Sequence, residues 1–148
     1  MKSKIRPDIY FIAFLALSIA LHFGLLIKKM LYPPYTYVGW VFIAVGPVLI
    51  MWCDLLFKKM ETTVKPYEQP TQLLISGPFR ISRHPMYLGM VMLLLGVAIV
   101  HGTLVSFVFP VVFGILMELL FIPFEEANLE RILGRQYLEY KQRVRRWV

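Results

Sequence analysis

The sequence contains almost no cysteine and comparatively few acidic side chains. Cys53 is the single cysteine among 148 residues, so no disulfide can form within the chain. Nine acidic residues stand against 16 lysines and arginines, which gives a formal net charge of +7. The basic residues lie at the ends of apolar blocks and along the last segment, where anionic lipid headgroups are more plausible partners than nucleic acid.

The chain also lacks the polar surface of a soluble domain. Its residues are 58% hydrophobic, against about 45–50% in soluble proteins. Four apolar blocks run approximately over 9–27, 35–57, 86–100 and 104–124. Roughly 20 apolar residues cross the hydrocarbon core of a bilayer, and only the third block is clearly shorter. We therefore predict one all-α domain over 1–148, a polytopic membrane protein with four transmembrane helices, two of them within 1–57.

The basic residues also predict an orientation. Four spans place the N-terminus, the 58–84 loop and the C-terminus on one side, and 14 of the 16 basic residues fall there. Only Lys28 and Lys29 lie on the other side, so the N- and C-termini are predicted to be cytoplasmic. The basic N-terminus resembles a signal peptide, but no small-residue cleavage site follows, and we expect the first span to be retained. The membrane would be the plasma membrane of a prokaryote or the endoplasmic reticulum of a eukaryote.

The last segment, 125–148, has the pattern of an amphipathic helix. Apolar and aromatic residues recur at spacings of three and four: Leu129, Ile132, Leu133, Tyr137, Tyr140, Val144 and Trp147. Most arginines and lysines of the segment lie off this stripe. Such a helix suits the cytoplasmic membrane interface, and equally suits a cover over the cytoplasmic mouth of the bundle.

Residues 83–89, Arg-His-Pro-Met-Tyr-Leu-Gly, form the first polar cluster. Proline favours the first position of a helix, so Pro85 should begin the third span with His84 at its cap. The free N–H groups there, with Arg83 and His84, suit an anion. Gly89 permits close approach of another backbone or a ligand. Alternatively, Arg83 is a membrane anchor and His84 an ordinary cap.

The pair Glu125-Glu126 forms the second cluster, and Glu118 is a further acid on the same segment. Glu125 and Glu126 directly follow the fourth apolar block, and Glu118 lies within it. A separation of seven residues should place Glu118 on the face of Glu125, about two turns deeper. An acid inside a span is a candidate functional residue, although a structural hydrogen bond would also explain it.

Together these motifs resemble the integral membrane methyltransferases, which include isoprenylcysteine carboxyl methyltransferases and phospholipid N-methyltransferases. The resemblance covers about 71–147 and rests on the segments Ser76-Gly77-Pro78-Phe79, 83–89, Glu125-Glu126-Ala127-Asn128-Leu129 and 134–147. It implies a cytoplasm-facing pocket for S-adenosylmethionine within 71–147, and a membrane lipid or lipidated substrate that enters between helices. It implies neither a metal nor nucleic acid.

The resemblance also implies which residues would contact the cofactor. These are Thr71, Gln72, Leu73, Leu74, Phe79, His84, Pro85, Met86, Tyr87, Glu125 and Glu126. Glu118 and Glu126 are the candidate catalytic residues. A carboxylate acceptor needs no base, whereas an amine must lose a proton to Glu118, Glu125 or His84.

Two other functions are compatible with this sequence. Membrane sterol reductases are distantly similar in the C-terminal half and use a nicotinamide cofactor. A small lipid-binding membrane subunit would carry the same motifs as architecture alone.

Overall fold

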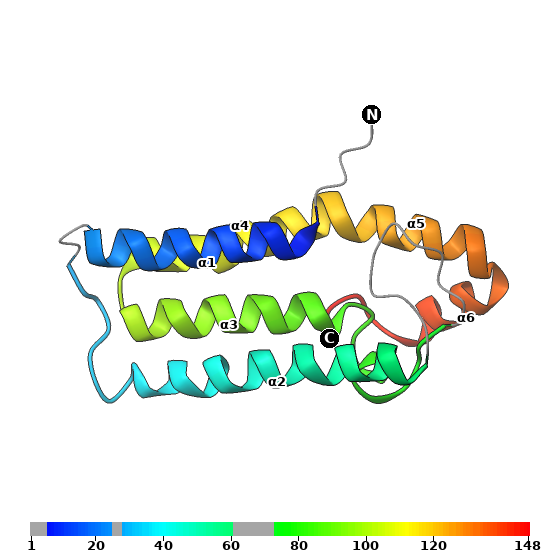
Figure 1. Cartoon of the computed structure of the whole chain (residues 1–148), viewed down its shortest axis with the longest axis horizontal. Coiled ribbons are helices and arrows are strands. Elements are labelled where there is room, and N and C mark those ends of the chain that lie inside the picture. Colours follow the sequence, from blue (N-terminus) through cyan, green and yellow to red (C-terminus); the bar gives the residue numbers. More distant parts are fainter. Residues whose placement is uncertain (1–5, 25–27, 61–72) are drawn as a thin grey trace.

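The computed structural model describes residues 6–24, 28–60 and 73–148, which are mostly helical. The elements are α1 (Pro7–Gly24), α2 (Tyr37–Lys59), the 3-10 helix η1 (Gly77–Arg80), α3 (Pro85–His101), α4 (Leu104–Leu116), the π-helical segment η2 (Met117–Phe121), α5 (Ile122–Leu133) and α6 (Arg135–Arg143). Successive long helices run antiparallel to one another. The start of α1, the end of α2, the start of α3 and the C-terminus therefore gather at one end of the bundle (Figure 1). This arrangement confirms the predicted all-α class.

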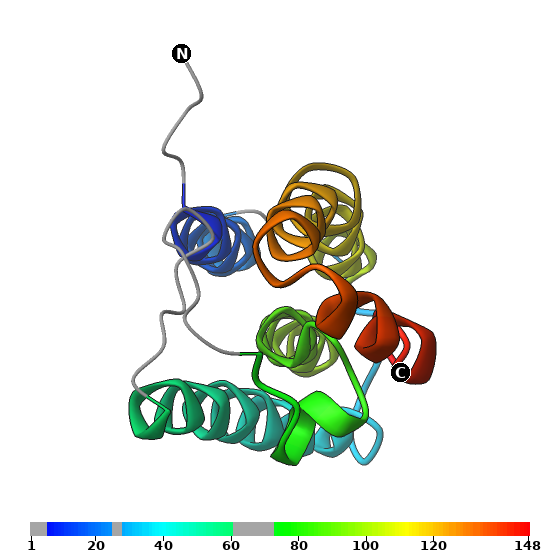
Figure 2. The same cartoon turned by 90° about the vertical axis from the view of Figure 1, so that its right-hand side faces the viewer.

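Three helical stretches are long and apolar enough to cross a membrane. They are α1, α2 and the continuous helix Leu104–Leu133 formed by α4, η2 and α5. The third predicted span, α3, is apolar but has only 17 residues. It lies in the middle of the bundle, between α2 on one side and α1 and α4 on the other (Figure 2). Because its neighbours surround it, α3 has little side-chain surface left to face lipid. The chain is an integral membrane protein, and four spans remain its predicted number.

Two pairs of glycines bring α2 and α3 into backbone contact. A Cβ placed on Gly46 would lie 2.7 Å from the carbonyl oxygen of Gly89, and one on Gly89 would lie 2.8 Å from that of Gly46. Gly39 and Gly96 face each other in the same way, one helical heptad away. Small residues let transmembrane helices approach closely enough for dispersion contacts between backbones. The predicted close approach at Gly89 is thereby confirmed, with the backbone of α2 as its partner.

The main apolar core joins α3 to the long C-terminal helix. Tyr87 and Leu94 of α3 pack with Phe113, Met117 and Ile122, all of them buried. Aromatic side chains of α1 meet this core edge-on, at Phe113 among others. The core thus fixes α3, which begins at the predicted polar motif, against the helix that carries the glutamates.

The π-helical segment changes which glutamates share a face. The N–H of Ile122 donates to the carbonyl of Met117, five residues back instead of four. A π turn takes more residues than an α turn, so the position above Glu118 moves from seven residues later to eight. Glu118 therefore aligns with Glu126, and the prediction that it shares a face with Glu125 is wrong.

The C-terminal segment is divided, unlike the single helix predicted over 125–148. Gly134 has φ of +52°, a positive value that side chains rarely allow and glycine adopts readily, and α5 ends there. The chain turns there into α6, and Val144 is already extended. The predicted stripe from Leu129 to Trp147 therefore does not lie on one helix.

Candidate functional site

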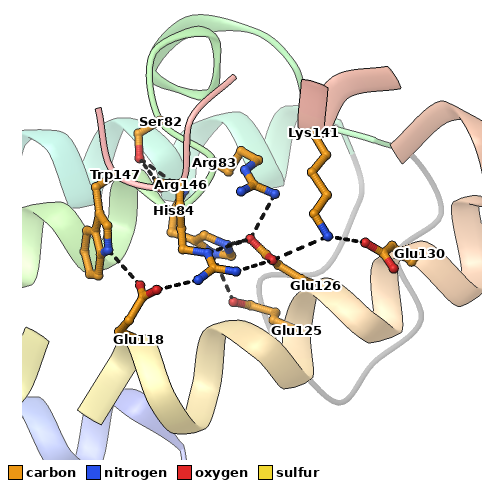
Figure 3. Close-up of polar contacts among 10 residues, drawn as sticks. All are labelled: Ser82, Arg83, His84, Glu118, Glu125, Glu126, Glu130, Lys141, Arg146 and Trp147. Atoms are coloured by element: carbon orange, nitrogen blue, oxygen red, sulfur yellow. Dashed lines mark hydrogen bonds and ion pairs between the residues drawn. The ribbon is translucent and has the colours of Figure 1, made fainter. Parts of the chain in front are cut away.

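The site lies at the bundle end where α3 begins, and loop 81–84 places its first residues. Pro85 is the first residue of α3 and His84 is the N-cap, as predicted. The His84 side chain does not cap the helix. The backbone N–H of His84 donates to Ser82 Oγ at 3.2 Å. The His84 imidazole points toward α5 (Figure 3).

Glu126 is the centre of a cluster of cations. Its side chain is only 5% exposed, and Arg83 Nη1 lies 3.0 Å from its Oε1. Arg146 donates to both of its oxygens, from Nε at 3.1 Å and from Nη2 at 2.8 Å. Lys141 Nζ lies 3.9 Å from Oε2 and also pairs with Glu130. A buried carboxylate is tolerable only when paired in this way, so Glu126 organises the site around it.

His84 lies between two carboxylates. Its Nδ1 is 3.4 Å from Glu125 Oε2, and its Nε2 is 3.4 Å from Glu126 Oε1. Burial alone lowers the pKa of the His84 imidazole, but the hydrogen bonds and charges of the two glutamates outweigh it, and the pKa is raised. A carboxylate oxygen therefore lies near each ring nitrogen, an arrangement that favours the protonated imidazole.

Glu118 joins the cluster through the C-terminal segment. Arg146 Nη1 donates to Glu118 Oε1, and Trp147 Nε1 donates to Glu118 Oε2 at 2.8 Å. Arg146 therefore bridges Glu118 and Glu126, the two carboxylates that η2 aligns (Figure 3). The Glu118 side chain is 36% exposed, far more than that of Glu126.

Sequence reasoning did not assign Arg146 and Trp147 to the site. Both were read as part of a helix, with Arg146 on its outer face. In the structure, the extended segment after α6 lies beside loop 81–84, where Arg83 N–H donates to Arg145 O at 3.0 Å and Ser82 Oγ donates to Arg146 O at 3.1 Å. Gly134 was the signal available in the sequence, since it is where the segment turns back.

Three of the remaining predicted cofactor residues, Leu74, Phe79 and Met86, belong to a second apolar cluster. Leu74 and Phe79 are buried there with Cys53, and Met86 packs against the cluster. Leu73 is half-buried, and Thr71 and Gln72 lie outside the described residues. The Tyr87 ring lies nearly parallel to that of His84, with 5.7 Å between their centroids. The fold therefore brings His84 and the Tyr87 ring together with Glu125 and Glu126, whereas Met86 packs against the second apolar cluster.

An apolar groove of about 550 Å³ runs between α3 and α4 and ends at the polar cluster, at Glu118. Glu118 and Trp147 line one part of it. The other lining residues are apolar or glycine: Val91, Leu95, Phe107, Pro110, Val111, Gly114, Ile115 and Leu119. The groove could hold an alkyl chain whose polar head meets Glu118.

Comparison with protein families gives a match to the family described as phospholipid methyltransferase, over residues 35–136. The match begins before the predicted 71–147 region and includes α2. The residues of α2, which showed only a generic apolar pattern, are thus part of the family pattern.

Several plant proteins are similar to this chain. Protein-S-isoprenylcysteine O-methyltransferase B of Arabidopsis thaliana is 34% identical over 80 residues, which cover 52% of this chain and 39% of that protein. A probable protein-S-isoprenylcysteine O-methyltransferase of Oryza sativa subsp. indica is 31% identical over 114 residues, 74% of this chain and 58% of that protein. The chain thus spans less than two thirds of these relatives.

The fold resembles that of a solved structure, the eukaryotic intramembrane Ras methyltransferase ICMT (isoprenylcysteine carboxyl methyltransferase). The TM-score is 0.58 at 19% identity, covering 95% of this chain and 51% of that one. This likeness concerns the fold.

Proposed function

Because the chain belongs to the phospholipid methyltransferase family, we propose that it transfers a methyl group from S-adenosylmethionine to the polar head of a membrane lipid or lipidated molecule. The observation that carries this proposal is the polar cluster of α3 and α5 at the end of an apolar groove. A soluble cofactor would reach the cluster from the water side, and an amphipathic acceptor would reach it from the bilayer.

The residues present fit the cofactor. Arg83 Nε is buried with no hydrogen-bond acceptor among the described residues, so it offers a donor for the cofactor's carboxylate. Glu125, with its side chain 21% exposed, suits the cofactor's ammonium or hydroxyl groups. Tyr87, stacked on His84, is the aromatic ring that a bound sulfonium would approach. When bound, S-adenosylmethionine supplies a methyl group that is already activated for transfer.

In this proposal the glutamates have separate roles. Glu126, saturated by Arg83, His84 and Arg146, holds the cluster together and does not take up a proton. Glu118 lies where the acceptor head arrives. Positioning an acceptor at the activated methyl supplies most of the rate enhancement in such a displacement. An amine acceptor would give its proton to Glu118, whereas a carboxylate has none to give.

The proposal also predicts which side of the membrane the site faces. The cluster would face the cytoplasm, where the cofactor is found, and both termini would lie there. This follows the distribution of lysine and arginine.

Calorimetry on the protein purified in detergent tests the cofactor. S-adenosylhomocysteine, the product form, should bind, and NADPH should not. His84→Ala should weaken S-adenosylhomocysteine binding by about one to two decades, because it removes the hydrogen-bond partner that positions Glu125. Arg143→Ala, an exposed basic residue at the end of α6, is the matched control and should bind normally. Binding of NADPH alone would refute the proposal in favour of a membrane reductase. Binding of neither would favour a lipid-binding subunit.

A further inference from the structure

Two hydrogen-bond donors, one on α6 and one on loop 81–84, are buried without an acceptor. Tyr137 is 1% exposed, and its hydroxyl has no hydrogen-bond partner among the residues that the structure describes. The Arg83 side chain is 9% exposed, and its Nε has no acceptor within the same residues. A buried donor without an acceptor is costly and rare in proteins, so this pair needs an explanation.

The two donors cannot satisfy each other. Burial raises the pKa of the Tyr137 hydroxyl to about 12 and the charge of Glu126 adds to the rise, although the neighbouring Arg83 lowers it. The hydroxyl therefore keeps its proton at neutral pH. A guanidinium has only donors, so Arg83 cannot accept that proton.

The neighbouring carboxylate is already engaged. Both oxygens of Glu126 accept hydrogen bonds from Arg146, and Oε1 also pairs with Arg83 Nη1 at 3.0 Å. An acceptor for Tyr137 and for Arg83 Nε must therefore come from elsewhere. A negatively charged oxygen suits this position best, because one of the two donors is a cation.

We infer that Tyr137 is a cofactor-binding residue, and that its hydroxyl and Arg83 Nε together bind the carboxylate of S-adenosylmethionine. The inference rests on the proposed function and deepens it. Tyr137 was predicted only as part of the apolar stripe of the C-terminal segment, and the inference makes α6 one wall of the cofactor site.

The charges around this pair suit an α-amino acid. In such a group the carboxylate and the ammonium are bonded to the same carbon, so their partners must lie close together. Arg83 and His84 are adjacent in the chain, and His84 Nδ1 lies 3.4 Å from Glu125 Oε2. Arg83 and Tyr137 would bind the carboxylate, while Glu125 would bind the ammonium.

A ligand can reach the two donors only if α6 moves, because neither donor atom is accessible to solvent. α6 follows Gly134, which has φ of +52° and open space around the position of a Cβ. The chain can therefore change direction there. On its other side, α6 is joined to η1 by a hydrogen bond from the Tyr140 hydroxyl to Phe79 O at 2.7 Å. The cofactor carboxylate would displace α6 outward, and α6 would then close on it through the Tyr137 hydroxyl.

Calorimetry with two ligands tests the carboxylate site on the full chain purified in detergent. The ligands are S-adenosylhomocysteine and its decarboxylated analogue, which keeps the adenosine, the thioether and the amine. The wild type should bind S-adenosylhomocysteine at least about tenfold more tightly than the analogue, as expected for a charged hydrogen-bonded pair. Tyr137→Phe should weaken S-adenosylhomocysteine binding about fivefold, the effect of one hydrogen bond, and should leave the affinity for the analogue unchanged.

Three results would overturn the inference: equal wild-type affinity for the two ligands, an equal loss for both ligands in Tyr137→Phe, or no loss for either. Binding of neither ligand to the wild type would instead refute the proposed function.

Tyr140→Phe is the matched control on the same helix. The Tyr140 hydroxyl already has an acceptor in Phe79 O, so its loss should change the affinities for both ligands by the same factor. A loss confined to S-adenosylhomocysteine in Tyr140→Phe would assign the carboxylate effect to the packing of α6, and would also overturn the inference.

Thermal unfolding without ligand separates an unpaired hydroxyl from a structural one. Tyr137→Phe should unfold at the wild-type temperature or higher, because the hydroxyl that it removes has no partner, whereas Tyr140→Phe should unfold at a lower temperature. S-adenosylhomocysteine should then raise the midpoint of the wild type more than that of Tyr137→Phe. A lower midpoint for unliganded Tyr137→Phe would show that the hydroxyl is bonded within the protein, and the inference would fail.

Discussion

The substitution Gly46→Ala tests whether backbone contact between α2 and α3 supports the whole site. The new Cβ would lie 2.7 Å from Gly89 O and 2.9 Å from Leu93 N, whereas ordinary contacts begin at 3.4 Å. The two helices would therefore have to separate by about 0.7 Å at Gly89, which lies four residues after Pro85 and five after His84. Overpacking of this kind costs about 1–3 kcal/mol, and alanine returns about 0.5–1 kcal/mol of helix propensity.

The middle of these ranges is a net loss of about 1 kcal/mol, which should lower the unfolding midpoint by about 2–4 °C. The assay is a thermal scan in detergent with a thiol-reactive dye, because the single cysteine, Cys53, is fully buried and becomes reactive only on unfolding. Gly114→Ala is the matched control within a helix, since its Cβ would meet only a Val91 methyl at 3.9 Å. A Gly46→Ala midpoint equal to that of Gly114→Ala would refute the reasoning.

Two further predictions concern charge and topology. The raised pKa of His84 means that its charged contacts stabilise the protein fully below pH 6.5 and are lost as the pH rises through the raised value. The unfolding midpoint of the wild type should therefore fall as the pH rises through that range, and the midpoint of His84→Gln should fall less. An equal dependence of the two midpoints on pH would contradict the raised pKa of His84. For topology, a cysteine at Met30 should react with an impermeant thiol reagent added outside intact cells, and one at Gln142 should not. Reaction at Gln142 would reverse the proposed orientation.

The polar motif at the start of α3 was readable from the sequence because its determinants are local. Pro85 has no backbone N–H to satisfy and its φ suits the first turn, so the helix begins there whatever surrounds it. Gly89 was equally informative, since a glycine inside a helix is costly unless something approaches closely. What approaches, the backbone at Gly46, depends on how α2 crosses α3.

The partner of Glu118 could not be predicted in the same way. Counting 3.6 residues per turn placed Glu118 on the same helix face as Glu125. The π-helical segment instead aligns Glu118 with Glu126. Nothing local to residues 117–121 marks a π turn unambiguously, although Pro123 follows it closely. The partners of Glu118, Arg146 and Trp147, arrive from 28 and 29 residues further along the chain.

The sequence by itself determined the apolar blocks, the helix that begins at Pro85, the basic bias of one side and the family motifs. Each of these depends on residue type and spacing along one segment. Only the tertiary structure decided which charges pair. The chain changes direction at Gly134, and the segment after α6 then lies beside loop 81–84. There the buried carboxylate of Glu126 pairs with Arg146, one of several basic residues of that segment. Selection of this kind depends on distance and burial, because a charge removed from water must find its partner where the fold has placed one.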